Sequence, residues 1–125
     1  MGTTTCVLVI DDEPDIREIA KISLKITKQW DVLTAASGLE GLDLAVSSRP
    51  DLILLDVTMP EMDGFETLKQ LRSHPVTEKI PVLLLTAAAK VVQQTEYVQV
   101  GAQGVLLKPF DPGALGDQIE VALKP

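Results

Sequence analysis

Short apolar runs alternate along the chain with longer stretches in which apolar and polar residues recur at helical spacing. A continuous apolar run is typical of a strand that is covered on both faces, as in a parallel sheet. The segment Asp31–Ala36 has fewer large apolar residues and mixes them with polar ones, which predicts a strand at the edge of the sheet. The other predicted strands are Cys6–Ile10, Leu52–Leu55, Val82–Leu85 and Val105–Leu107.

Local signals mark where the helices between these strands begin. Pro14 and Pro112 each follow an acidic residue and fit the first turn of a helix, where the missing N–H is not needed. The segment Ser37–Glu40 has the pattern of a capping box, and Asp63 is a suitable N-cap for the helix that follows it. The helix expected within residues 87–100 has the weakest pattern, because good helix formers are mixed there with β-branched residues.

Strands that alternate with helices predict an α/β fold, a three-layer doubly wound arrangement with helices on both faces of a parallel sheet. In such a sheet the carboxyl ends of the strands lie along one edge, and ligands bind there. Several residues far apart in the sequence are therefore expected to converge on one crevice. They are the polar residues at the ends of the buried runs: Asp11, Asp12, Glu13, Asp56, Thr86 and Lys108.

The acidic residues of this edge predict a cation site, because carboxylates held close together repel one another unless a cation neutralises them. Ligands that are all oxygen favour a hard ion, and a few carboxylates beside open positions suit Mg²⁺ better than Ca²⁺. An Asp at such a site can act as a nucleophile toward phosphorus, while Lys108 and Thr86 donate to the phosphoryl oxygens. Each of these residues alone has an ordinary structural explanation, such as a turn or a helix cap. Their joint placement at the ends of the strands is what favours a phosphoryl-transfer site. For Glu13 we expect only a structural role.

Composition narrows the classes of function. The chain has 125 residues and a formal charge of −7, and its Lys and Arg residues are scattered, which disfavours a nucleic-acid partner. No apolar run approaches the roughly 20 residues of a membrane span, and the N-terminus has no signal-peptide pattern. We expect a cytoplasmic protein with a flexible leader at residues 1–5 and one domain at residues 6–125.

Four segments of the chain, in the same order and spacing, resemble the receiver domain of two-component response regulators, a CheY-like domain. They are VLVIDDEPDIRE, PDLILLDVTMPEMDGFETLKQLR, IPVLLLTA and GAQGVLLKPF. The resemblance implies a flavodoxin-like fold with five parallel strands in the order 2-1-3-4-5. It also implies a phosphorelay, in which a sensor histidine kinase or a histidine phosphotransfer protein phosphorylates the domain and so switches a protein-binding surface.

The same resemblance implies a role for each residue that matches the family's motifs. Asp56 is the implied phosphoacceptor. Mg²⁺ is the implied cofactor, bound by Asp12, by Asp56 and by the backbone carbonyl of Thr58, with Asp11 acting through water. The bond between Lys108 and Pro109 is commonly cis in the family, and we expect a cis bond here.

One position departs from the family pattern. The family often has an aromatic residue three positions before its lysine, and here Val105 stands there. The usual coupled movement of that aromatic ring with Thr86 is therefore not available in its ordinary form. The sequence ends soon after the last predicted helix, so we expect output through a protein partner, from a monomer or a weak phosphorylation-dependent dimer. We expect no enzyme activity beyond the domain's own phosphorylation and dephosphorylation.

Other functions fit the sequence less well. A small phosphohydrolase with an aspartate nucleophile would have a second Asp two residues after the first, where this chain has Thr58. A flavodoxin-like cofactor binder needs a phosphate-cradling loop after the first strand, where the acidic residues 11–15 would repel phosphate. A receiver-like module that binds proteins without phosphorylation remains as the main alternative.

Overall fold

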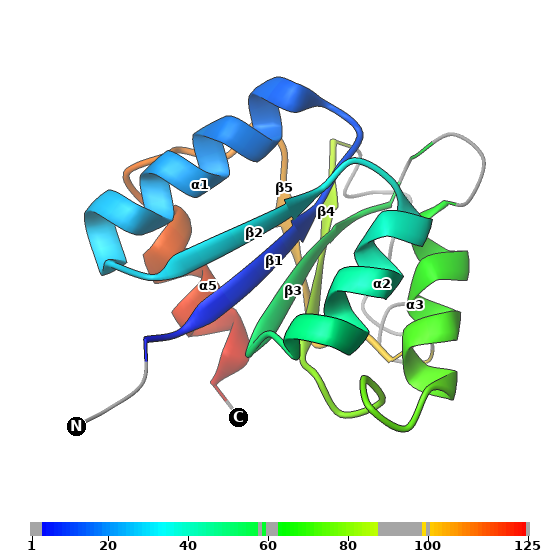
Figure 1. Ribbon diagram of the computed structural model, residues 1–125. Coiled ribbons are helices and arrows are strands. Elements are labelled where there is room, and N and C mark those ends of the chain that lie inside the picture. Colours follow the sequence, from blue (N-terminus) through cyan, green and yellow to red (C-terminus); the bar gives the residue numbers. More distant parts are fainter. Residues whose placement is uncertain (1–3, 58, 60–62, 88–98, 100, 125) are drawn as a thin grey trace.

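The structure, a computed structural model, describes residues 4–57, 59, 63–87, 99 and 101–124. Its sheet has five parallel strands in the order β2-β1-β3-β4-β5 (Figure 1), which confirms the doubly wound α/β fold and the implied strand order. Most of the expected helix at residues 87–100 lies outside the described residues. The described elements are β1 (Cys6–Ile10), α1 (Pro14–Lys28), β2 (Asp31–Ala35), α2 (Gly38–Ser48), β3 (Leu52–Asp56), α3 (Gly64–Ser73), β4 (Val82–Thr86), β5 (Gly104–Leu107) and α5 (Leu115–Leu123).

Helices cover both faces of the sheet. Helices α1 and α5 lie on one face, and α2 and α3 lie on the other (Figure 1). Neighbouring residues of one strand enter different cores: Leu54 packs on the side of α1 and α5, whereas Leu55 packs on the side of α2 and α3. All residues of β3 and β4 are buried, which explains their continuous apolar sequence. Strand β2 is only partly buried and lies at the edge, as predicted.

The register brings the carboxyl ends of the strands to the same edge. Ile10 at the end of β1 pairs with Ala35 of β2 and with Leu55 of β3. Thr86 at the end of β4 pairs with Leu107 at the end of β5. Residues that follow these positions in the sequence must therefore lie near one another at this edge.

Two predicted helix caps are confirmed. The hydroxyl of Ser37 accepts a hydrogen bond from the amide of Glu40 at 3.1 Å, and a carboxylate oxygen of Asp63 accepts one from the amide of Glu66 at 2.9 Å. The capping box differs in one detail, because the Glu40 carboxylate accepts from the amide of Ala36 at 2.6 Å, one residue before the cap. The Ser37 and Asp63 side chains thus bind amides in the first turn of α2 and α3 that have no partner inside the helix.

The two prolines behave differently. Pro14 occupies the first turn of α1, as predicted. The prediction for Pro112 is wrong, because α5 begins after this proline and not at it. Asp111 instead closes a turn, in which its side chain accepts from the amide of Gly113 at 2.9 Å and its carbonyl accepts from the amide of Ala114 at 2.9 Å.

Among the described residues, no helix combines the length and the apolar sequence that a membrane-spanning helix needs.

Candidate functional site

Four carboxylates meet at the edge where the strands end. Asp11 directly follows β1, and its amide donates to the carbonyl of Ala35 at 3.1 Å, which continues the strand pairing by one residue. Asp56 is the last residue of β3. Oxygen atoms of the Asp11, Asp12, Glu13 and Asp56 carboxylates all lie within 4.8 Å of one another. The predicted convergence of these acidic residues is therefore present in the fold.

The loop after β1 is held by its own hydrogen bonds. The amide of Glu13 donates to a carboxylate oxygen of Asp11 at 2.9 Å, and the guanidinium of Arg17 donates to the Asp11 carbonyl at 2.8 Å. Asp11 is fully buried, while Asp12 beside it is half-buried. The loop thus fixes one carboxylate in the interior and leaves the next one accessible.

Lys108 supplies the positive charge of the site. It directly follows β5, and its amide donates to the carbonyl of Thr86 at 2.8 Å, which fixes the start of its side chain. The bond from Lys108 to Pro109 is cis, as the family resemblance implied. The lysine Nζ lies 3.0 Å from Asp11 Oδ2, 3.1 Å from Glu13 Oε1 and 3.4 Å from Asp56 Oδ1.

The charge state of Lys108 follows from these contacts. Its side chain is only 9% exposed, and this burial alone would lower its pKa. The pKa is nevertheless raised, because the hydrogen bonds to Asp11 and Glu13 and the charges of Asp11 and Asp56 favour the ammonium form. Lys108 is therefore a permanent cation at neutral pH.

The donor set of the cluster fits a magnesium ion. The single positive charge of Lys108 contacts three of the four carboxylates, so the cluster keeps an excess of negative charge. Its ligands are all oxygen atoms, and Asp12 and Glu13 are accessible to solvent. A hard divalent cation that keeps some of its water suits such a site. Thr58, whose carbonyl the resemblance implied as a ligand, lies outside the described residues.

Two further residues shape the edge beside Asp56. Thr86 ends β4, is buried, and is joined to Lys108 through the backbone hydrogen bond. Gly64 begins α3, and a Cβ atom at this position would lie 2.2 Å from the carbonyl oxygen of Asp56 and 2.7 Å from the Cα of Val57. Only glycine allows the helix to begin so close to the strand end that carries the central carboxylate.

Glu13 is the residue that sequence reasoning assigned incompletely. We expected a structural role, yet its carboxylate contacts the Lys108 ammonium directly. Its side chain makes no capping bond to α1, although Glu13 occupies the N-cap position. The acidic run after β1 was the available signal, but the sequence does not reveal which of three consecutive acids points toward a lysine 95 residues away.

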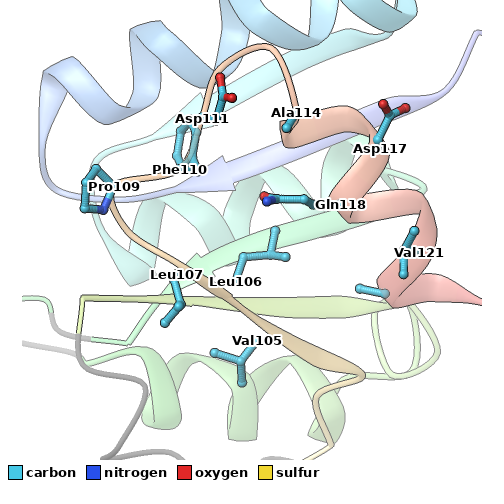
Figure 2. Close-up of a pocket in the computed structure, with 11 residues that line it drawn as sticks. Val105, Leu106, Leu107, Pro109, Phe110, Asp111, Ala114, Asp117, Gln118 and Val121 are labelled. Atoms are coloured by element: carbon cyan, nitrogen blue, oxygen red, sulfur yellow. The ribbon is translucent and has the colours of Figure 1, made fainter.

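A separate groove lies between β5 and α5 (Figure 2). It has a volume of about 670 Å³, and Leu106, Leu107, Phe110 and Val121 supply much of its apolar lining. Val105, which replaces the usual aromatic residue, is partly buried, packs against the core on the side of α2 and α3, and also lines this groove. None of the four clustered carboxylates lines the groove, so it is distinct from the charged site.

Comparisons with known proteins agree with this geometry. The family model of the response regulator receiver domain matches residues 7–120. The chain is 41% identical over 105 residues to the DNA-binding dual master transcriptional regulator RpaA of Synechocystis sp., an alignment that covers 84% of this chain and 43% of that protein. It is 36% identical over 118 residues to the alkaline phosphatase synthesis transcriptional regulatory protein PhoP of Bacillus subtilis, covering 94% and 48%. The chain therefore spans about half the length of these curated relatives.

Solved structures give the same result over the whole fold. The chemotaxis response regulator CheY4 of Vibrio cholerae superimposes with a TM-score of 0.88 at 37% identity, covering 97% of this chain and 100% of that one. A putative response regulator from Chloroflexus aurantiacus superimposes with a TM-score of 0.86 at 31% identity, covering 97% and 98%. With its strand order, its clustered carboxylates and its lysine at one edge, this chain belongs to the response regulator receiver domain family of two-component signalling.

Proposed function

We propose that Asp56 accepts a phosphoryl group from the phosphohistidine of a sensor histidine kinase or a phosphotransfer protein. The observation that carries this proposal is the contact of Lys108 Nζ with Asp56 Oδ1 at 3.4 Å, inside a cluster of carboxylates at the ligand-binding edge of the sheet. A fixed cation beside a carboxylate nucleophile is the arrangement that phosphoryl transfer needs.

The transfer is a displacement at phosphorus. A carboxylate oxygen of Asp56 forms the new P–O bond while the P–N bond to the donor histidine breaks, and the electron pair of that bond remains on the imidazole. Lys108 provides an N–H donor for a phosphoryl oxygen from the side of β5, and the Thr86 hydroxyl provides another from the end of β4. The product is an aspartyl phosphate on the chain.

The chain also offers the ligands for the Mg²⁺ that this chemistry uses. In our proposal Asp12, Asp56 and the carbonyl of Thr58 hold the ion, and Asp11 acts through water. When bound, the ion neutralises charge on the phosphoryl oxygens. Buried Asp11 keeps Lys108 in place by direct contact at 3.0 Å.

The proposed role is that of a phosphoacceptor and not of an enzyme with a separate substrate. The proposed unit is residues 6–125, preceded by a short leader, and it acts in the cytoplasm through a protein partner as a monomer or a weak phosphorylation-dependent dimer. Since the chain spans about half the length of its curated relatives, the transcriptional functions in their names are not transferred to it.

Intact-protein mass spectrometry tests the proposal. The chain is incubated with Mg²⁺ and acetyl phosphate, and the expected result is the gain of one phosphoryl group. The gain should disappear in Asp56→Asn and in the presence of a chelator. Asp51→Asn is the matched control, because Asp51 lies at the other end of β3, where it accepts a hydrogen bond from the Cys6 amide at 2.8 Å.

The outcomes separate the proposal from its alternatives. A gain in the wild type and in Asp51→Asn, but not in Asp56→Asn, supports Asp56 as the acceptor. No gain from acetyl phosphate, or from a phosphorylated kinase or phosphotransfer domain, would contradict the proposal and favour a module that binds proteins without phosphorylation.

A further inference from the structure

Glu13 occupies a distinctive place among the charged residues of the site. Its side chain is 59% exposed, whereas the side chain of Asp11 is fully buried and that of Asp56 is 3% exposed. Its carboxylate contacts the lysine and forms no capping bond to α1, although Glu13 occupies the N-cap position of this helix. Among the residues that the structure describes, Glu13 is thus the solvent-facing carboxylate that contacts Lys108.

The distances around Lys108 show how its ammonium group is shared. It lies 3.1 Å from Glu13 Oε1 but 3.4 Å from Asp56 Oδ1. An ammonium group has three N–H donors, and Asp11 and Glu13 each accept a hydrogen bond from this one. While both bonds are kept, only one N–H is left for a phosphoryl group on Asp56, and a second hydrogen bond to that group would have to displace Asp11 or Glu13. Asp11 is buried and held by the loop, so Glu13 is the partner that can most readily move into solvent.

We propose that Glu13 is a positioning residue that restrains phosphorylation of Asp56, because its carboxylate competes with the incoming phosphoryl group for Lys108 and repels an anionic donor. This inference rests on the proposed function of Asp56. With acetyl phosphate, the bond between phosphorus and the acetyl oxygen breaks, acetate leaves with the electron pair, and the carboxylate of Asp56 forms the new P–O bond. Glu13 takes no part in these bonds and acts through Lys108 and through its own negative charge.

The test compares initial rates of phosphorylation for the wild type and Glu13→Gln at saturating Mg²⁺. Glutamine keeps the size of the side chain and an oxygen that accepts from Lys108, but it removes the negative charge. We expect Glu13→Gln to react about fivefold faster with acetyl phosphate, as the loss of one nearby charge implies. This increase in rate should be smaller with phosphoramidate, which carries less negative charge than acetyl phosphate. It should also become smaller at high salt.

Two further variants make the result specific. Glu18→Gln changes the net charge equally on an exposed position of α1, and its rate should equal that of the wild type. Glu13→Asp keeps the charge on a shorter side chain, and its rate should lie nearer to the wild type than to Glu13→Gln. This dependence on donor charge and on the conservative variant would not arise from a merely structural role.

Mg²⁺ affinity, measured by calorimetry on the same variants, completes the test. A slower Glu13→Gln with weakened Mg²⁺ binding would overturn the inference, because Glu13 would then be a ligand that assists the reaction. If the wild type accepts a phosphoryl group but Glu13→Gln and Glu18→Gln react at equal rates, this inference alone would be overturned. Failure of the wild type to accept a phosphoryl group from any donor would instead reject the proposed function on which it rests.

Discussion

Lys108 and Lys28 each contact more than one carboxylate, but they do so in opposite surroundings. Lys108 is 9% exposed and reaches Asp11 and Asp56, whose side chains are 0% and 3% exposed. Lys28 joins α1 to α5 through Asp117 at 2.7 Å and Glu120 at 2.5 Å. Those two carboxylates are 74% and 50% exposed, so water already solvates them.

The difference concerns what each lysine makes possible. Removing buried charges from water costs free energy that their attraction only partly offsets, so the cluster at Lys108 is a poor source of stability. The ion pairs of Lys28 are screened and connect two helices that already pack together. The site edge therefore holds unfavourable charge in a fixed geometry around Asp56, the proposed phosphoacceptor, whereas the Lys28 ion pairs are ordinary surface contacts between α1 and α5.

Two glycines repeat the contrast. A Cβ atom at Gly64 would meet backbone atoms of the strand end that carries Asp56, the nearest at 2.2 Å. The nearest atoms to a Cβ atom at Gly116 would belong to the side chain of Lys28, the first of them at 2.7 Å. Backbone at the site cannot move without moving Asp56, the proposed nucleophile, but the side chain of a lysine can change its conformation.

Replacement of Lys108 is expected to have the largest effect on phosphorylation and on stability. Lys108→Met should lower the phosphorylation rate by about 100-fold, because a preorganised donor to the phosphoryl group is lost. It should also lower the free energy of unfolding by about 3 kcal/mol without Mg²⁺, since two buried carboxylates lose their cation. Mass-spectrometric rates and urea unfolding measure the two effects.

Lys28→Met is the matched control for this prediction. It should leave the phosphorylation rate unchanged and lower the melting temperature less than Lys108→Met does. Equal rates for the two variants would show that Lys108 is not part of the reacting site.

Gly64→Ala is expected to have the next largest effect. The added Cβ would push against backbone of β3 and the residue after it, and such overpacking costs about 2 to 3 kcal/mol. Urea unfolding should show a midpoint well below that of the wild type. An unchanged midpoint would mean that α3 can begin farther from Asp56 without loss.

Gly116→Ala is expected to change the free energy of unfolding by less than about 0.5 kcal/mol. Displacement of the Lys28 stem is opposed by the better helix propensity of alanine inside α5. The same urea experiment measures this variant. If Gly116→Ala lowered the free energy of unfolding as much as Gly64→Ala does, the contact of α1 with α5 would be as rigid as the site.

The smallest expected effect is a pH dependence. The pKa of Lys108 is raised in the folded chain, so the stability from its ion pairs is fully present below the ordinary lysine pKa of 10.5 and is lost only as pH rises through the higher folded value. The destabilisation caused by Lys108→Met should therefore be equal at about pH 7 and about pH 9. If the destabilisation by Lys108→Met were clearly smaller at the higher of these two pH values, the folded lysine would lose its proton at a lower pH than its raised pKa implies.

Much of the fold follows from the sequence because its signals are local. Continuous apolar runs identified the strands, and Ser37 and Asp63 identified two helix starts. Pro112 was misplaced because the Asp111 turn, which also uses an acid before a proline, competes with a helix start in the same few residues. The position of β2 beside β1 came from the family resemblance, since the apolar pattern alone does not order strands.

The site was predictable only in part for a related reason. The ends of parallel strands must meet at one edge, so the convergence of Asp11, Asp56 and Lys108 followed from topology. The side-chain contact between Glu13 and Lys108 did not follow, because it depends on how the loop after β1 turns. The roles of individual residues in phosphorylation remain predictions.

Locating the phosphoryl group within the chain tests directly whether Asp56 is the acceptor. After phosphorylation with acetyl phosphate and Mg²⁺, borohydride reduction converts an aspartyl phosphate into homoserine, and peptide mass spectrometry finds its position. We expect homoserine at position 56 alone. Homoserine at Asp11 or Asp12, or none in a chain that has gained a phosphoryl group, would contradict it.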